Sequence, residues 1–221
     1  MKYTVLILVL CFSFACGSKE KQENSIENQT ANLSGVDSTY LCVPCKSVGK
    51  ITANTTEADL VRWFGRENVI TEKSAFDGGE IIITTIFRGT EKQLIINWKD
   101  EDNLTGVASC EINNEDTVWQ IPYGIKPSTP LARLNELNGK PFVFSGFGWD
   151  FGGNILDYKG GKLEQFRECY GLSLSDASED NAYNLADEAS QQVMGDNDVM
   201  SDNKVLEKMN IKVSVVRILF N

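Results

Sequence analysis

Residues 54–65 read NTTEADLVRWFG, and residues 128–139 read STPLARLNELNG. Each stretch opens on side chains that can cap the free amides of a helix, and each closes on a glycine that can take the exit turn. Between these ends, apolar residues recur at the three- and four-residue spacing of a buried helix face. The two stretches therefore predict two short amphipathic helices. The expected capping residues are Asn54 or Thr55 in the first helix and Ser128 or Thr129 in the second, with Pro130 at the first helical position of the second.

Strand-like segments follow each predicted helix. They are rich in β-branched and aromatic residues, which fit the pleated surface of a sheet. These segments are 80–87 and 93–98 after the first helix, and 141–145 and 153–158 after the second. Because the order of the elements and their spacing repeat, the sequence predicts an internal duplication. The expected fold class is α+β, with tandem helix-plus-antiparallel-sheet repeats forming one continuous sheet.

The two expected repeats cover residues 40–125 and 126–221. In the second, an acidic segment contains a predicted helix at 182–193 and precedes an alternating run at 211–220. Because alternation is the pattern of a half-buried strand, that run predicts a strand that completes the sheet.

The amino terminus has the pattern of an exported chain. Met1 and Lys2 precede a run of about a dozen apolar residues, which is shorter than the roughly 20 that a membrane-spanning helix needs. Residues 1–15 are therefore expected to be a cleaved signal peptide. Residues 13–18, SFACGS, resemble the bacterial lipobox, in which a small residue precedes a cysteine that becomes acylated, although Ser13 replaces the usual leucine. The resemblance implies lipidation of Cys16, with an ordinary cleaved signal and a chance cysteine as the alternative.

Residues 16–39 are polar and carry very little apolar surface. Such a segment cannot offset the entropy lost when it becomes ordered, so we expect a flexible, lipidated tether. Two or three acyl chains of palmitate length bury enough methylene groups for durable anchoring to a membrane. The sequence thus predicts a lipid-anchored protein of the bacterial cell envelope, in the outer membrane and on either its periplasmic or its surface face.

Charge and composition argue against two classes of function. The net charge is -10 and the sequence pI is about 4.6, without the clustered lysines and arginines of a nucleic-acid-binding surface. The sequence contains no histidine, which removes the commonest general base and the commonest metal ligand. No pairing of a nucleophile with a base stands out, so we predict a protein that is not an enzyme and has no cofactor.

The order of elements from Ile51 to Leu163 resembles the tandem helix-plus-sheet folds of the beta-lactamase inhibitor protein and of small outer-membrane assembly lipoproteins. The amino-acid sequences of four stretches also resemble those of a widespread set of uncharacterised exported bacterial proteins. These stretches are 64–69, 95–100, 137–142 and 146–153. The resemblances imply the fold and the export of the chain, and they imply no activity, because fold alone does not determine function.

Four cysteines lie beyond the predicted tether, namely Cys42, Cys45, Cys110 and Cys169. The Cys42-x-x-Cys45 motif is compatible with a redox dithiol, half of a zinc site or a structural disulfide. Its polar flanks lack the strand and the helix that surround a thioredoxin-like motif. Because thiols outside the cytoplasm usually pair, we predict two structural disulfides, with Cys42–Cys45 and Cys110–Cys169 as the favoured pairing.

Residues 145–153, SGFGWDFGG, combine three aromatic residues with four glycines. Strands rather than a helix are expected to follow, so the stretch does not predict a phosphate-binding loop. One interpretation is a bulged strand pair whose aromatic side chains enter the core. The other is an exposed patch in which Phe147, Trp149 and Phe151 bind a partner.

Residues 195–203, GDNDVMSDN, bring several oxygen ligands close together. The stretch lacks the central glycine and the distal glutamate of a calcium loop of the EF-hand type. We therefore expect a solvated loop and no metal site, with Ser201 or Asp202 capping a short helix at 204–209.

Together these features predict a non-catalytic, membrane-anchored envelope lipoprotein that binds a protein or ligand partner. The alternative is a thiol-active redox protein of the envelope that uses Cys42 and Cys45.

Overall fold

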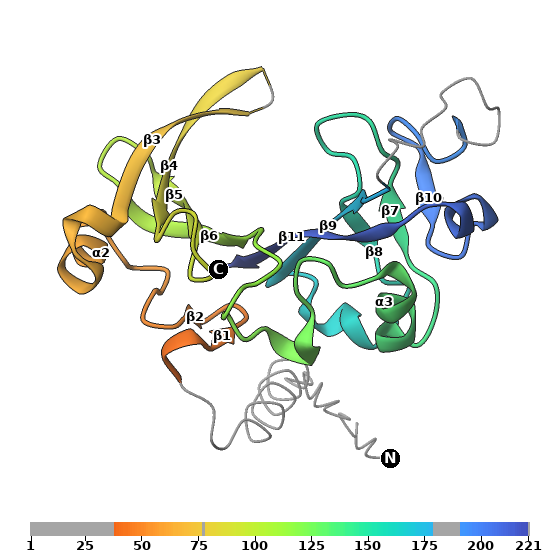
Figure 1. The fold of residues 1–221 in the computed structure, drawn as a ribbon, viewed down its shortest axis with the longest axis horizontal. Coiled ribbons are helices and arrows are strands. Elements are labelled where there is room, and N and C mark those ends of the chain that lie inside the picture. The colour runs from red at the N-terminus through yellow and green to blue at the C-terminus, as the bar shows by residue number, and fades with distance from the viewer. Residues whose placement is uncertain (1–37, 77, 179–190, 221) are drawn as a thin grey trace, which may run out of the picture. The chain divides into compact units, whose positions relative to one another are not determined.

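Six antiparallel strands form the main sheet, in the order β3-β4-β5-β6-β11-β9 (Figure 1). Its strands are β3 Val69–Phe76, β4 Gly79–Ile86, β5 Leu94–Asp100, β6 Thr105–Ile112, β9 Tyr170–Asp176 and β11 Ile211–Leu219. The closing strand predicted at 211–220 is therefore confirmed. It lies inside the sheet, where β11 pairs with β6 on one side and with β9 on the other.

The computed structural model describes residues 38–76, 78–178 and 191–220, which belong to a compact unit spanning Asp37–Asn221. The predicted signal peptide, Cys16 and nearly all of the predicted tether lie outside the described residues. So does most of the helix predicted at 182–193. No helix in the described ranges combines the length and the apolar character required to cross a membrane.

Smaller elements surround the main sheet. A three-stranded sheet has the order β10-β7-β8, and a two-stranded sheet pairs β1 with β2. Their strands are β1 Cys42–Val43, β2 Ser47–Val48, β7 Val143–Ser145, β8 Ile155–Asp157 and β10 Asp198–Met200. The α-helices of the described residues are α2 Glu57–Phe64 and α3 Leu131–Asn138, and the 3-10 helices are η2 Ser38–Tyr40, η3 Arg66–Asn68, η4 Pro122–Gly124, η5 Lys162–Phe166 and η6 Lys204–Lys208.

The described chain is thus a mixed fold dominated by antiparallel sheets. The expectation of one continuous sheet was wrong, because the hydrogen-bonded ladder divides into three sheets. The interruption lies between β8 and β9, where an isolated bridge joins Asn154 to Ser173.

The first predicted helix is confirmed as α2, but its capping residue is Thr56 rather than Asn54 or Thr55. The Asp59 amide donates to Thr56 Oγ1 at 3.2 Å, and the Thr56 amide donates to Asp59 Oδ2 at 3.1 Å. This reciprocal capping box satisfies two amides at the helix start. Thr55 is instead buried, and its hydroxyl accepts from the Thr52 amide at 2.9 Å.

The capping box has a measurable electrostatic consequence. The Thr56 hydroxyl and the Thr56 amide both donate to the Asp59 carboxylate and lower the pKa of that carboxyl below its ordinary value. A depressed pKa stabilises the fold above the ordinary pKa of aspartate, and this contribution is lost as the pH falls through the folded-state value.

We expect Thr56→Ala to raise the pKa of Asp59 towards its ordinary value, as measured by NMR titration of the carboxyl carbon. Asp100, whose pKa is lowered chiefly by the Asn103 side chain, serves as the internal control and should not change. An Asp59 pKa that stays fully depressed in the variant would contradict the assigned cause.

The second predicted helix, α3, begins at Leu131, with Pro130 at its capping position and without a side-chain cap. Ser128 and Thr129 do not cap it because they shape the preceding turn: Ser128 has a φ of 74°, and Thr129 Oγ1 accepts from the Lys126 amide at 2.9 Å. The predicted exit at Gly139 is confirmed, with a left-handed φ of 78°.

The segment predicted to be a solvated loop at 195–203 is partly a strand. Within it, β10 pairs with β7, and Ser201 is buried, where its hydroxyl accepts from the Phe142 amide at 2.9 Å. The residue that caps η6 is Asn203, whose Oδ1 accepts from the Val205 amide at 3.0 Å, rather than Ser201 or Asp202.

The two faces of the main sheet differ in polarity. Ile96 on β5 is opposite Cys110 on β6, which is in turn opposite Ile218 on β11, and all three side chains are fully buried. Helices α2 and α3 pack against strands of the same sheet. Because successive side chains of a strand point to opposite faces, the residues next to these core positions point the other way. Four of these residues, namely Asn97, Ser109, Glu111 and Arg217, are polar, and they form the floor of the candidate site.

Candidate binding groove on the polar face of the sheet

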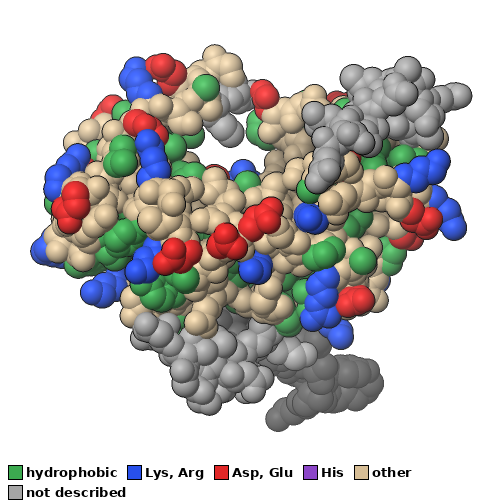
Figure 2. All heavy atoms as spheres, in the orientation of Figure 1, with side chains coloured by type: hydrophobic (Ala, Val, Ile, Leu, Met, Phe, Trp, Pro, Cys, Tyr) green, Lys and Arg blue, Asp and Glu red, His purple; other side chains and the backbone are tan. Residues whose placement is uncertain are grey.

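A groove of about 430 Å³ lies on the polar face, with its floor on β5, β6 and β11. The β3–β4 hairpin and the loop that joins β7 to β8 rise on either side of it (Figure 1). Figure 2 shows the surface hollowed between these two parts. Ile81 and Ile82 of β4 line one side, and Phe151 and Asp150 of the loop line the other. The groove is therefore built from segments far apart in the sequence.

The floor of the groove is a connected hydrogen-bond network. Arg217 Nε donates to Glu111 Oε1 at 2.9 Å, and Arg217 Nη1 donates to Ser173 Oγ at 2.8 Å. Asn97 Nδ2 donates to the same Glu111 oxygen at 3.1 Å and to Ser109 Oγ at 3.0 Å. Because each polar group holds its neighbour, the floor presents oriented donors and acceptors without reorganising when a ligand arrives.

We expect Arg217→Met to lower the free energy of unfolding by about 2 kcal/mol, because it leaves the partly buried Glu111 carboxylate without its charged partner. This expected loss already allows for solvent screening, since the Arg217 and Glu111 side chains are 32% and 22% exposed. Urea unfolding measures the change.

Arg133→Met is the matched control for this experiment. Its ion pair with Glu136 is 54% and 67% exposed, so its loss should change the stability by less than about 0.5 kcal/mol. Equal effects of the two substitutions would show that the floor network does not stabilise the fold.

The three aromatic residues predicted to bind a partner occupy two environments. Phe147 is buried at 4% exposure and packs against Phe144, with ring centroids 5.3 Å apart. Trp149 and Phe151 are exposed by 42% and 38%, and their rings meet edge to face at 5.3 Å. Phe147 thus belongs to the core, whereas Phe151 is exposed and lines the groove, and partner binding through this stretch stays a prediction.

The charged residues that line the groove are Glu101, Glu111, Asp150 and Arg217, so carboxylates outnumber cations. Arg217 is already paired with Glu111. No ion pair among the described residues involves Glu101 or Asp150. The groove is consequently suited to a ligand that brings a positive charge.

Sequence reasoning missed the residues of the floor. Asn97, Ser109, Glu111 and Arg217 were not singled out, because no local motif contains them. The register of β5, β6 and β11 brings them together, with Glu111 directly opposite Arg217. The available signal is a charged residue within an apolar run, as Arg217 is within residues 215–219, VVRIL.

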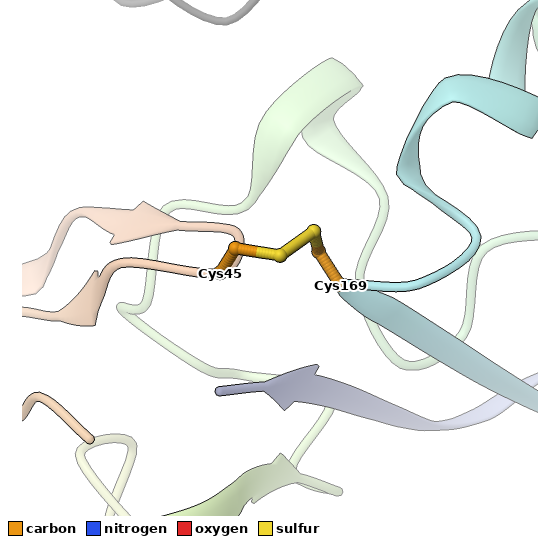
Figure 3. Close-up of a disulfide and its surroundings, with 2 residues drawn as sticks. All are labelled: Cys45 and Cys169. Atoms are coloured by element: carbon orange, nitrogen blue, oxygen red, sulfur yellow. A yellow bond between two sulfur atoms is a disulfide. The ribbon is translucent and has the colours of Figure 1, made fainter. Parts of the chain in front are cut away.

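The predicted pairing of the cysteines was wrong. Cys45 bonds to Cys169, with Cα atoms 4.8 Å apart across a sequence separation of 124 residues (Figure 3). The bond joins the turn after β1 to the start of β9. Cys42 and Cys110 are free thiols. One of the two expected disulfides is therefore present, between cysteines that were not expected to pair.

The free thiols lie in an apolar environment that suppresses their reactivity. Cys42 is 1% exposed and Cys110 is 0% exposed. Burial raises the pKa of each thiol well above its ordinary value, and for Cys110 the nearby Cys42 adds to the effect. Since thiolates are the reactive form, burial suppresses the reactivity of both thiols. The bond of Cys45 to Cys169 leaves Cys42 without Cys45 as its partner in a dithiol.

No group of three or more carboxylates or cysteines in the described ranges is placed to hold a metal ion.

No protein-family model matches this chain, and no curated protein matches it. Among solved structures, the uncharacterized protein yfeY from Escherichia coli aligns with a TM-score of 0.44 and 15% sequence identity. The alignment covers 79% of this chain and 97% of that one.

Proposed function

We propose that this chain is a non-catalytic lipoprotein of the bacterial cell envelope, anchored through lipid on Cys16, whose folded part binds a protein or ligand partner. The observation that carries the binding role is the groove, which joins a preorganised polar floor to an exposed aromatic wall. Sites that bind specific partners combine apolar contact area with a few oriented polar groups in this way.

Two features support an envelope location. The leader has the pattern of a processed signal, and Cys16 follows it directly. The Cys45–Cys169 disulfide is a bond that persists in oxidising compartments such as the periplasm and the cell surface.

We also infer that the folded part is a tandem duplication. In the first half, α2 precedes β3, β4, β5 and β6, which are neighbours in sequence order. In the second half, α3 precedes β7 and β8, which pair with each other. An isolated bridge joins Asn154, just before β8, to Ser173 of β9, and β9 pairs with β11. The last strands of the two halves, β6 and β11, pair with each other. On this inference the floor of the groove crosses the junction, since Glu111 comes from one half and Arg217 from the other.

Fractionation with intact mass measurement tests the anchor. We expect the wild-type chain in the membrane fraction, carrying acyl mass on a new amino-terminal cysteine, and Cys16→Ser in the soluble fraction. Adding reductant should increase the mass by the hydrogens of one disulfide. Recovery of an unacylated wild-type chain from the cytosol, with its leader intact, would refute the proposal.

Site-specific photo-crosslinking tests the groove. A benzophenone amino acid in place of Phe151 should give a discrete adduct in intact cells, whereas the same probe in place of the exposed Glu136 on α3 should not. The same adducts from both positions, or none from position 151, would remove the support for binding in the groove.

A further inference from the structure

Strand β4 is longer than its pairing with β5. It pairs with β3 along its whole length, from Ile86 opposite Val69 to Gly79 opposite Phe76. Its pairing with β5 begins only at Ile83, which is opposite Asn97. Beyond Asn97, β5 has an irregularity and follows β6 instead. Among the described residues, no strand therefore pairs with the β5 side of β4 from Glu80 to Ile82.

The backbone N–H and C=O groups of Glu80 and Ile82 point away from β3. The Ile82 amide donates to Glu101 Oε2 at 2.7 Å, so its outward direction is observed directly. In an antiparallel ladder, alternate residues direct their N–H and C=O groups to the same side. Glu80, two residues before Ile82, consequently presents its N–H and C=O outward as well. The Glu101 carboxylate occupies the place that a neighbouring strand would give to a backbone carbonyl, so an added strand would displace this carboxylate from the Ile82 amide.

The open edge borders the groove described above. Ile81 and Ile82 line it together with Glu101, and Phe151 and Asp150 face them from the loop between β7 and β8. An extended chain on this edge would thus have a backbone partner on one side and an aromatic contact on the other. A lysine or arginine in that chain would meet Glu101 and Asp150, the carboxylates without an ion-pair partner.

We propose that the edge of β4 from Glu80 to Ile82 adds an extended, basic segment of a partner protein as a further strand of the sheet. The inference rests on the proposed binding function and specifies how the partner is held. Backbone hydrogen bonds supply affinity in this mode, and pockets for alternate side chains supply selectivity. Residues two positions apart in a strand share a face, so the segment carries an apolar residue, which contacts Ile81 and Phe151, and two positions away a lysine or arginine, which pairs with Glu101 and Asp150.

The outer edge of β3 is the competing place for such a strand, and it fits less well. Its residues Glu72 and Lys73 are exposed, and they are engaged in ion pairs with Arg88 and Glu80. Charged side chains on an edge strand disfavour strand addition, and β3 carries two neighbouring ones where the β4 edge carries only Glu80. The groove lining does not extend to any β3 residue.

A peptide selection on the full chain in detergent tests the inference. The probe is a random dodecapeptide library displayed on phage, and selected peptides are synthesised and measured by fluorescence anisotropy. We expect enriched peptides to carry lysine or arginine two positions away from an apolar residue. Glu80→Pro, which removes an outward amide that pairs with no other strand, should raise their Kd by about tenfold or more, the loss expected for a hydrogen bond and its neighbouring contacts.

The structure offers a matched control. Ala75 is directly opposite Glu80 in the ladder, so Ala75→Pro removes an outward amide from the far edge of the same hairpin. It should change the Kd by less than about twofold, as should Glu80→Gln, which removes only the charge. Should Glu80→Pro fail to fold, hydrogen exchange on the wild-type chain decides, because peptide binding should slow exchange of the Glu80 amide and not of the Ala75 amide.

The outcomes separate the inference from the function on which it rests. Peptides that bind equally well to Glu80→Pro but weakly to Phe151→Ala would overturn strand addition and leave the groove as a binding site. A selection that enriches no peptide would count against both. Dimerisation of the wild-type chain that Glu80→Pro abolishes would overturn the inference, because a second copy of the chain would then occupy the edge.

Discussion

Replacing Cys45 and Cys169 together by serine is expected to lower the free energy of unfolding by about 4 kcal/mol. The disulfide closes a loop across 124 residues, so it removes much of the conformational freedom of the unfolded chain. Urea unfolding followed by tryptophan fluorescence measures the difference. Adding reductant to the wild-type chain should cause the same loss.

The double variant supplies its own control. Since Cys42 and Cys110 are free thiols, reductant should not destabilise the double variant further. A further loss would show that these two cysteines also pair. An unchanged midpoint on replacing Cys45 and Cys169 would show that the bond between them does not stabilise the fold.

The second large effect is expected for Gly153→Ala, which should cost at least about 3 kcal/mol of stability. Gly153 has a φ of +77°, and a Cβ there would lie 2.0 Å from the carbonyl oxygen of Leu174. The Leu174 carbonyl oxygen is a backbone atom, so it cannot rotate away from the added Cβ. The same glycine donates to the Ser145 carbonyl at 2.7 Å and accepts from the Leu174 amide at 2.8 Å, so relief by displacement would break the links between β7, β8 and β9.

Gly160→Ala separates the cost of the left-handed backbone from the cost of the close contact with Leu174. Gly160 has a similar φ of +67°, but a Cβ there would meet nothing within 4 Å. Its substitution should cost only the strain of a left-handed backbone, about 1 kcal/mol. Similar losses at both positions, measured by thermal unfolding, would show that the contact with Leu174 is unimportant.

The elements with strong local signals were predictable. Both helices were found because capping residues and a terminal glycine enclose an amphipathic stretch, and the errors amount to one or two residues at each start. At α3 the reason is specific: the Thr129 hydroxyl serves the turn before the helix rather than the helix itself. The closing strand β11 was found because apolar and polar residues alternate from Ile211 to Val215 and the run stays largely apolar to Leu219.

Three strands of the main sheet were not predicted. In β3, Glu72 and Lys73 lie side by side on an exposed ribbon, so no apolar face appears in the sequence. The Asp77-Gly78 dipeptide, a favoured hairpin turn, was the signal that could have found it. Strands β6 and β9 contain small and polar residues, because Ser109 of β6 lies in the floor of the groove and Ser173 of β9 accepts a hydrogen bond from Arg217 of that floor.

The groove itself could not be predicted from one sequence. Glu111 and Arg217 are 106 positions apart, and only the pairing of β6 with β11 makes them neighbours. Phe151 was noticed because aromatic residues and glycines are conspicuous together. Its exposure depends on how the loop after β7 folds back, with the Gly152 amide donating to the Trp149 carbonyl at 2.9 Å. Residue types suggest candidates, but strand register decides which of them meet.

The bond between Cys45 and Cys169 also determines how the molecule would respond to mechanical load. Tension that enters along the amino-terminal segment reaches Cys45 and passes through the two sulfurs directly into the start of β9. The intervening chain, which includes α2 and the strands from β3 to β6, is bypassed because a covalent bond does not extend. Pulling on the amino-terminal segment would therefore strain first the backbone bonds of residues 40–42 with Gln120 and then β9 and β11, and it would leave the β3–β4 hairpin unloaded.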